Sequence, residues 1–534
     1  MRVHVSSNSL GNPIDAAVLG GEYLGWTGFP GFEAQAQAVS IGHLRWPGGI
    51  NAEDRIDSSG YAYDLSTPNV VDNWDTWNGS AKAGITETMG YARENGLSYS
   101  MIVPSARYVE MAMTDYSGAI EWLKADIEAF TARLASNQFG DLPYITLEVG
   151  AEYYSTDIWE ETQGAPETLH MFANIFSNLV SELALAEETH GELYEIAVQM
   201  GRFQSRDDPE VGMRDGEASD SLVFLDEYES LGVLQEIDSV VWHRYTERFD
   251  QIDDAFRQSI HHSNSMSTLL ANHREVWETR VGGELDLVVS WLSPDIDSSG
   301  DETNTDFDHG PRSAHNILQM FSEVAASGAD VATVYGMDTQ WPGSLSYGTP
   351  SNPEIYFGGA VYGLLSESVV GLSVTSTYEE NFLPLNKDNS IIPSDHANFF
   401  SFDGSDRAVI IAAASKLTSD AMSIELNHDD MHQFDFVRIT KLTPIGDDAF
   451  ATAERNYIPP IEFLEDSLWF DFDNDFEVVR VELFEDIPVP SGREIVDTYH
   501  RKDGTVTQVI GTAHDIGDPN PMYSGIADVD HFLF

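Results

Sequence analysis

The 534-residue chain contains no cysteine, few basic residues and no long apolar run. Without cysteine no disulfide can form, so the protein depends on the size of its core and not on covalent crosslinks. No stretch approaches the roughly 18 uninterrupted apolar residues of a membrane-spanning helix, which predicts a soluble protein. Residues 1–5 also lack the apolar run of a secretory signal, so the expected location depends on chemistry and not on a targeting segment.

The shortage of basic residues gives the chain a strongly negative charge. Its 27 Lys and Arg stand against 89 Asp and Glu, a formal net charge of −62. This charge repels phosphate backbones and anionic lipids over a Debye length of about 8 Å, so neither nucleic acid nor a membrane is an expected partner. Self-repulsion also destabilises a compact fold at low ionic strength, which favours a natural medium rich in salt or divalent cations, such as seawater or brine.

The chain does contain enough apolar residues for a large core, with 42% hydrophobic and 11% aromatic residues. Its length exceeds that of one ordinary core and favours a large α/β domain followed by a smaller second domain. The sequence makes no prediction of the oligomeric state.

Short apolar runs alternate with helical periods over roughly the first 345 residues. Eight candidate strands centre on Leu19, Leu44, Ile102, Leu147, Val198, Val241, Val288 and Val334. Helices are expected between them, over residues 81–95, 118–136, 166–188, 219–231, 252–280 and 312–327. Because parallel strands need crossovers of helical length, this alternation predicts an α/β fold, a (β/α)8 TIM barrel. A doubly wound sheet is disfavoured because no GxGxxG pattern follows the first strand.

After about Gly371 the helical period ends and short alternating strands separated by turn residues follow. This pattern predicts an additional C-terminal antiparallel β-sandwich domain. The expected boundaries are a catalytic barrel over residues 10–365 and a sandwich over residues 366–534, which the opening strand, residues 1–9, is expected to join.

The carboxyl ends of the barrel strands carry residues suited to sugars. Barrel enzymes place their reactive groups at these ends. Aromatic faces stack on sugar rings and charged groups bind hydroxyls, so the pattern favours a polysaccharide or oligosaccharide ligand over a phosphate. The candidate substrate-binding residues at the strand ends are Arg45, Trp46, Asn51, Tyr153, Arg244, Trp291, Asp338 and Trp341.

Glu152 is the strongest candidate for a catalytic acid. It follows strand four and is flanked by Tyr153 and Tyr154, an apolar setting that would raise the pKa of a carboxyl group towards that of a general acid. The alternative is an ordinary solvated loop carboxylate.

Four strand-end motifs resemble the clan A retaining glycoside hydrolases, especially their arabinofuranosidase and xylosidase-like branch. The motifs are LRWPGG at strand two, LEVGAEYY at strand four, VVWHRYT at strand six and VVSWLS at strand seven. The resemblance implies a retaining glycosidase scaffold in which the sandwich packs against the barrel as structural support. Members carry Gly-Asn-Glu after strand four, which makes Glu152 the implied acid/base and His243 and Tyr245 implied sugar-binding residues.

The chain departs from this family in two places. Ala151 replaces the Asn that usually holds the 2-hydroxyl of the sugar, and Ser290 occupies the nucleophile position before Trp291. A serine hydroxyl cannot replace the nucleophilic carboxylate without a strong base.

Three explanations for Ser290 are open. The chain is an engineered variant without its nucleophile, or a natural divergence in which another acid supplies the second carboxylate, or a protein that has abandoned hydrolysis. The candidates for that second carboxylate are Asp295, Asp297 and Asp338.

The third explanation leads to two alternative functions. Tyr245 and His243 could perform β-elimination in a uronate lyase, with Arg244 neutralising the uronate. The protein could instead be a non-catalytic glycan-binding protein that kept the pocket.

No cofactor and no catalytic metal are expected. The acidic loop 297–310 could hold a structural calcium ion, but it lacks the EF-hand spacing, and a solvated loop is the alternative. Because polysaccharides lie outside cells, we expect a secreted, extracellular enzyme of a halophilic type.

Overall fold

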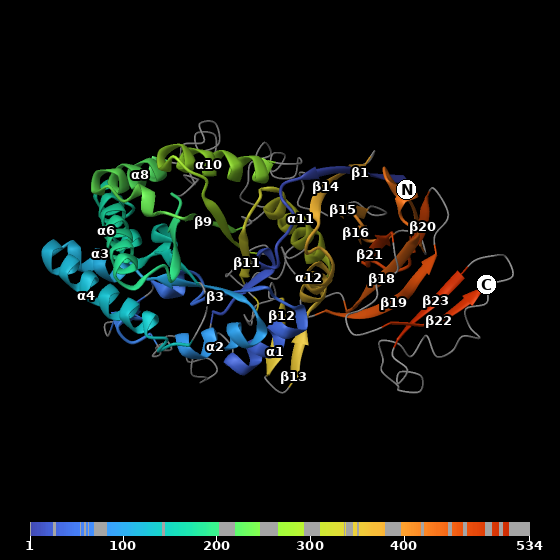
Figure 1. Ribbon diagram of the computed structural model, residues 1–534, viewed down its shortest axis with the longest axis horizontal. Helices are drawn as coiled ribbons and strands as arrows, with labels where there is room; N and C mark the ends of the chain where they lie inside the picture. The colour runs from blue at the N-terminus through green and yellow to red at the C-terminus, as the bar shows by residue number, and fades with distance from the viewer. Residues whose placement is uncertain are drawn as a thin grey trace.

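The computed structural model has two parts, a helix-covered barrel and a large β-sheet beside it (Figure 1). The structure describes residues 2–24, 28–53, 55–57, 60–61, 63–68, 83–140, 145–201, 219–245, 265–292, 310–335, 337, 345–349, 352–379, 397–417, 421–446, 451–462, 467–485, 494–500 and 506–511.

Eight parallel strands close the barrel in the spatial order β10-β11-β2-β3-β6-β7-β8-β9. The strands in chain order are β2 (Gly20–Glu22), β3 (His43–Trp46), β6 (Ser98–Val103), β7 (Ile145–Val149), β8 (Tyr194–Gln199), β9 (Ser239–Tyr245), β10 (Asp286–Leu292) and β11 (Val331–Tyr335). Each corresponds to one of the eight apolar runs of the sequence, and the predicted (β/α)8 barrel is confirmed.

Helices connect these strands and cover the outside of the barrel (Figure 1). They are α1 (Phe29–Val39), α2 (Ile85–Asn95), α3 (Ala106–Ala112), α4 (Tyr116–Ala135), α5 (Asp157–Glu161), α6 (Pro166–His190), α8 (Ser219–Leu231), α10 (Ser265–Val281), α11 (Ser313–Ala326) and α12 (Phe357–Ser368).

The sequence pattern did not predict α1, α12 or the short helices α3 and α5. Helix α1 carries Pro30 in its first turn, where proline is tolerated because its missing N–H would have no partner there. Helix α12 is buried along most of its length and has three glycines, so it shows no polar face to mark an amphipathic period.

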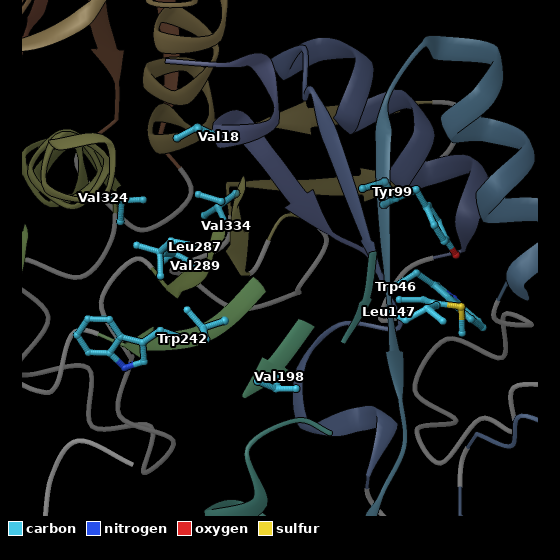
Figure 2. Packing of buried hydrophobic residues seen from close by; sticks show 14 of the residues in the cluster. Val18, Trp46, Tyr99, Leu147, Val198, Trp242, Leu287, Val289, Val324 and Val334 are labelled. Atoms are coloured by element: carbon cyan, nitrogen blue, oxygen red, sulfur yellow. The ribbon is translucent and has the colours of Figure 1, made fainter. Parts of the chain in front are cut away.

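Side chains along the barrel strands alternate between the surrounding helices and the barrel interior. In β10, Leu287 and Val289 belong to the core shared with the helices, which also contains Val324 of α11 (Figure 2). Val288 lies in the interior instead, in a small apolar cluster with Ala197 and Val241. The same alternation turns Ser290 inwards, so the polar residue of this apolar strand faces the barrel interior.

The second part is a nine-stranded sheet in the order β19-β18-β21-β16-β15-β14-β1-β17-β20. The strands are β1 (Arg2–Leu10), β14 (Ser373–Glu379), β15 (Ala397–Asp403), β16 (Arg407–Ala414), β17 (Met422–His428), β18 (Phe436–Ile445), β19 (Thr452–Glu462), β20 (Leu468–Phe472) and β21 (Val478–Phe484). Neighbouring strands are antiparallel except for β1 and β17, which are parallel. The sheet is therefore mixed at this one pair and antiparallel elsewhere.

The predicted C-terminal sandwich is confirmed as an architecture. Strands from both ends of the sheet contribute to one apolar cluster, with Ile424 of β17 and Ile439 of β18 among its members, so the sheet folds over on itself. After Arg407, strand β16 is apolar because both of its faces are buried: Ile410 lies in this cluster and Ile411 in the core shared with the barrel.

The sheet packs on the barrel through helices α11 and α12. Phe321 of α11 meets Phe402 of β15 with ring centroids 6.1 Å apart. Arg480 of β21 pairs with Glu367 of α12 at 3.2 Å. These contacts join the two parts through both apolar packing and an ion pair.

Three small hairpins complete the described chain. They are β4 (Arg55–Asp57) with β5 (Gly60–Tyr61), β12 (Ser346–Thr349) with β13 (Asn352–Ile355), and β22 (Glu494–His500) with β23 (Val506–Gly511). Among the described helices, none is both long and apolar enough to cross a membrane.

Candidate active site

Four of the residues predicted from the sequence come together at the carboxyl end of the barrel: Arg45, Glu152, His243 and Ser290. They lie on or after β3, β7, β9 and β10. Two further acids, Glu22 of β2 and Glu148 of β7, complete the group. We call these six residues the charged network.

The loop after β7 places Glu152 in a constrained position. Gly150 has φ 73°, and a Cβ atom there would lie 2.4 Å from the ring of Phe176, so only glycine fits. Glu152 itself has φ 44° and ψ 46°, the left-handed conformation that residues with a side chain rarely adopt. Such backbone strain persists only where the surrounding structure imposes it, and it is frequent at functional sites.

His243 connects Glu152 to Arg45. Its Nδ1 lies 2.9 Å from Glu152 Oε1, and its Nε2 lies 3.1 Å from Arg45 Nη2. A guanidinium group can only donate hydrogen bonds, so Nε2 must accept, and the ring proton is on Nδ1. His243 therefore donates a hydrogen bond to the Glu152 carboxyl group from a fixed orientation.

Arg45 and Glu148 form a fully buried ion pair. Arg45 Nη2 donates to Glu148 Oε2 at 2.7 Å, and Nε donates to both carboxylate oxygens at 2.9 Å. Ser100 also donates to Glu148 Oε1 at 2.9 Å. Burial alone would raise the pKa of Glu148, but the Arg45 guanidinium outweighs burial and lowers it. Glu148 is thus ionised and has both oxygens engaged.

Glu22 is the third buried acid of the network. Its Oε1 lies 3.1 Å from Arg45 Nη1 and accepts hydrogen bonds from Thr333, at 2.8 Å, and from Ser290. Within the described part of the chain, Glu22 Oε2 has no hydrogen-bond partner. The carboxylate is therefore anchored through one oxygen.

His43 lies one layer deeper in the barrel. Its Nδ1 is 2.7 Å from Ser98 Oγ and its Nε2 is 2.9 Å from Ser100 Oγ. Burial lowers the pKa of His43 to about 4, so the ring is neutral at physiological pH. It supports Ser100, which in turn donates to Glu148.

Glu53 ties three of the loops at the carboxyl end of the barrel together. Its carboxylate accepts hydrogen bonds from the backbone N–H groups of Ser105, at 2.8 Å, Ala106, at 2.7 Å, and Ala151, at 3.2 Å. Burial raises the pKa of Glu53, and the N–H donors of Ala106 and Ser105 oppose this rise. The contact with Ala151 fixes the residue directly before Glu152.

Two of the predicted substrate-binding residues are buried in the core. Trp46 donates from Nε1 to Ala83 O at 3.0 Å and is 1% exposed. Tyr153 is fully buried beneath α6 and α8, and its hydroxyl donates to Asp220 at 2.6 Å. Both rings support the strand ends from behind and do not present a face at the barrel opening.

The remaining predictions fall where the structure gives no side-chain description. Asn51 lies in the short turn after β3, Arg244 and Tyr245 lie at the end of β9, and Trp291 lies in β10, each without a described side chain. The other predicted positions outside the described residues are Asp295, Asp297, Asp338, Trp341 and nearly all of the acidic loop 297–310.

Sequence reasoning missed Glu22 and Glu148. Each stands in an apolar strand, GGE in β2 and ITLEV in β7. A carboxylate inside a strand that is buried on both faces must have a partner, because burial of an unpaired charge is very costly. That signal, together with the single arginine of LRW, would have indicated a buried ion pair.

One group of side chains in the described residues has the donor types of a metal site: Asp403, His428 and Asp430, in the sheet. The N–H of Asp430 donates to His428 Nδ1 at 3.1 Å, so a ring proton belongs on Nε2, which lies 3.5 Å from Asp403. A ligating nitrogen must be unprotonated. His428 Nε2 has no hydrogen-bond partner among the described residues, so its polar contact there is this one with Asp403.

The charged network can hold a carboxyl group for proton transfer. Glu152 is oriented by His243 Nδ1, and His243 is held by the buried Arg45 guanidinium. Glu148 and Glu22 offset the charge of Arg45. A second carboxylate, Glu22, lies 3.1 Å from Arg45 Nη1. Paired carboxyl groups in a water-poor site suit general acid/base chemistry at a polar bond.

Comparison with known proteins gives similarity at the level of the fold. No protein-family model and no curated protein sequence matches the chain. Among solved structures, the GH51 arabinofuranosidase from Xanthomonas axonopodis pv. citri has a TM-score of 0.58 at 12% identity, over 90% of this chain and 99% of that one.

Two further solved structures are similar over the same shares of both chains, 90% of this one and 99% of the other. The alpha-L-arabinofuranosidase from Thermotoga maritima has a TM-score of 0.55 at 11% identity. A bifunctional glucanase-xylanase from a metagenome library has a TM-score of 0.52 at 12% identity. The barrel and its appended sheet therefore form an architecture that glycoside hydrolases also have.

Proposed function

We propose that the protein is a glycoside hydrolase that cleaves a polysaccharide or oligosaccharide, with Glu152 as its general acid and base. The main support is the hydrogen bond from His243 to Glu152 at the carboxyl end of a closed barrel, beside buried Arg45. Barrel enzymes place their active sites at this end. A carboxyl group that can exchange a proton with a glycosidic oxygen is the central requirement of glycoside hydrolysis.

The hydrogen bonding assigns a role to each oxygen of Glu152. His243 Nδ1–H donates to Oε1, so a proton on the carboxyl group belongs on Oε2. Oε2 is then the atom that protonates the leaving oxygen of the sugar. Because Arg45 donates to Nε2, His243 keeps the orientation that this assignment requires.

The substrate class follows from the similar folds. Arabinofuranosidases and a glucanase-xylanase share this architecture, so arabinan, arabinoxylan, xylan and β-glucan are the first polysaccharides to test. The acidic composition, with a net charge of −62, favours an uncharged glycan over a polyanionic one and an extracellular, saline medium.

The test is release of reducing ends from these four polysaccharides by the native protein and by Glu152→Gln. We expect Glu152→Gln to lower kcat by about 10²- to 10⁴-fold, because the amide cannot donate an acidic proton. Glu160→Gln, an exposed position on α5, is the matched control and should retain full activity. Equal activity of the native protein and Glu152→Gln would refute the assignment of Glu152.

The same assay separates the other two functions. A lyase would release products that absorb as unsaturated uronates when it is incubated with polyuronates. The structure gives no support to His243 as the base of such a reaction, since one ring nitrogen donates to Glu152 and the other accepts from Arg45. Measurable glycan affinity without any product would identify a binding protein.

A further inference from the structure

Glycoside hydrolysis requires a second carboxyl group besides the general acid. In strand β10, the inward-facing residue of the charged network is Ser290, which has no carboxyl group. Among the described residues of the charged network, the remaining acids are Glu22 and Glu148. These two carboxylates differ in how their oxygens are held.

Both oxygens of Glu148 already accept hydrogen bonds from the protein. Its Oε1 accepts from Arg45 and Ser100, and its Oε2 accepts two hydrogen bonds from Arg45. Any bond from Glu148 to a sugar would break a bidentate ion pair that is fully buried, and such pairs are costly to disrupt.

Glu22 is held differently. The hydroxyls of Ser290 and Thr333 donate to its Oε1, and the Arg45 guanidinium forms an ion pair with the same oxygen. None of the described residues donates to its Oε2. The negative charge is stabilised through one oxygen, while the other is buried and accepts no hydrogen bond from a described residue. This arrangement suits a carboxylate that must attack through one oxygen and later leave again.

The loop after β3 brings Glu22 and Glu152 to the same place. A Cβ atom on Gly48 would lie 3.1 Å from Glu22 Oε2, and a Cβ atom on Gly49 would lie 3.9 Å from Glu152 Oε1. The two carboxyl groups therefore border two consecutive residues of one loop. Because both residues are glycine, neither of them places a side chain over a carboxyl group.

Both carboxyl groups are also shielded from bulk water, with Glu22 at 0% and Glu152 at 6% exposure. Shielding of this kind protects a reactive covalent intermediate between two steps of a reaction.

We propose that Glu22 is the nucleophile of this enzyme, and that Ser290 holds its carboxylate from the strand where the sequence offers no acid. This inference rests on the proposed glycosidase function. In the first step Glu22 Oε2 bonds to the anomeric carbon, the bond from that carbon to the leaving oxygen breaks, and this oxygen takes the proton of Glu152. In the second step Glu152 takes a proton from water, the water oxygen bonds to the anomeric carbon, and the ester bond returns its electron pair to Glu22.

The experiment uses the full chain and aryl glycosides with a good leaving group, namely the 4-nitrophenyl arabinofuranoside, xyloside and glucoside. Glu22→Ala should lower kcat by at least about 10³-fold. Sodium azide should raise the kcat of Glu22→Ala by at least about tenfold, because the small anion fills the space of the missing carboxylate. The product should be a glycosyl azide of the opposite anomeric configuration.

Glu148→Ala is the matched control, because Glu148 is equally buried and pairs with the same arginine. Its activity falls only through misplacement of Arg45, so azide should restore nothing. Ser290→Glu is the second variant. It brings a carboxylate against Glu22, and repulsion between the two should lower activity about tenfold or more.

Four results would overturn the inference. The first is an activity of Glu22→Ala within tenfold of the native protein, and the second is a loss in this variant that azide does not restore. The third is an equal restoration of Glu148→Ala activity by azide. The fourth is an activity of Ser290→Glu that exceeds the native activity by orders of magnitude. Each leaves the glycosidase proposal standing as long as the native protein hydrolyses a substrate and Glu152→Gln does not. A native protein that hydrolyses none of the glycosides or polysaccharides would refute both proposals.

Discussion

At the scale of single residues, Arg45 decides the electrostatics of the site. It is fully buried and lies within 3.1 Å of both Glu22 and Glu148. It also fixes the ring proton of His243 by donating to Nε2. One guanidinium therefore balances two buried carboxylates and orients the group that contacts Glu152, a combination that a lysine with a single charged nitrogen could not reproduce.

We expect Arg45→Met to lower the free energy of unfolding by about 3–5 kcal/mol, because it leaves two buried carboxylates without a counter-charge. The control is Arg2→Met. Arg2 pairs with Glu425 at 2.7 Å but is 72% exposed, so its loss should cost less than about 1 kcal/mol. Urea unfolding at neutral pH measures both, and similar costs for the two variants would contradict this account.

At the scale of elements, the loop after β7 depends on its packing against α6. Gly150 combines a positive φ with close approach to Phe176, and Glu53 holds the N–H of Ala151 from the opposite side. Glu152 is thus positioned by a strand, a helix and a loop from another strand. The left-handed backbone at Glu152 is maintained by these contacts and not by its own preference.

Gly150→Ala should destabilise the protein by about 2–4 kcal/mol, through both the positive φ and the contact with Phe176. Gly96→Ala isolates the first effect, because Gly96 has φ 68° and nothing lies within 4 Å of its added Cβ. It should cost only about 1 kcal/mol. In a Phe176→Ala background, the stability cost of Gly150→Ala should fall to about that of Gly96→Ala, because the added Cβ no longer meets the Phe176 ring. Denaturant midpoints measure these costs, and an unchanged cost in this background would contradict the account.

His43 links β3 to β6 and makes this pair of strands sensitive to acid. Burial lowers its pKa to about 4 from 6.5, so the folded protein binds fewer protons than the unfolded chain between these values. The contribution of the neutral His43 ring to the free energy of unfolding is therefore complete above pH 6.5 and is lost as the pH falls towards 4. We expect it to reach about 3 kcal/mol.

His43→Gln tests this, since an amide can hydrogen-bond to Ser98 and Ser100 without titrating. The free energy of unfolding, measured from pH 7 to pH 4, should fall less steeply in the variant than in the native protein. His273→Gln is a second test, because burial also lowers the pKa of His273 to about 4. Parallel curves for native protein and both variants would exclude these histidines as the cause.

At the scale of the whole molecule, a net charge of −62 on a chain without disulfides makes stability depend on the solvent. The charged network has a similar excess of acidic over basic side chains, with one arginine for three glutamates. Inside the barrel that excess is balanced by hydrogen bonds, whereas at the surface only counter-ions can reduce it.

We expect the Tm to rise steeply with added NaCl, mostly below about 1 M, where the Debye length falls to about 3 Å. KCl at equal ionic strength should raise it equally, because screening does not depend on ion identity. Sucrose at equal osmolality serves as the control for general exclusion from the surface. A flat Tm, or an effect of sucrose equal to that of salt, would contradict a screening mechanism.

The sequence by itself determined the architecture, because strand and helix formation depends on local periodicity. The eight apolar runs and the later alternating strands are readable within windows of a few residues, as in DLVVSWL and RAVIIAAA. It also determined that Glu152, His243 and Arg45 belong to one end of a barrel, since strand ends in a closed parallel barrel converge.

Only the tertiary structure decided how these residues pair. Glu22 and Ser290 are 268 positions apart in the chain, and no local pattern indicates that one binds the other. Trp46 and Tyr153 have the residue types of a sugar platform, yet packing turns them into the core. Side-chain partners depend on the closure of the barrel, which brings the first strand against the eighth, and such long-range contacts leave no periodic signal in the sequence.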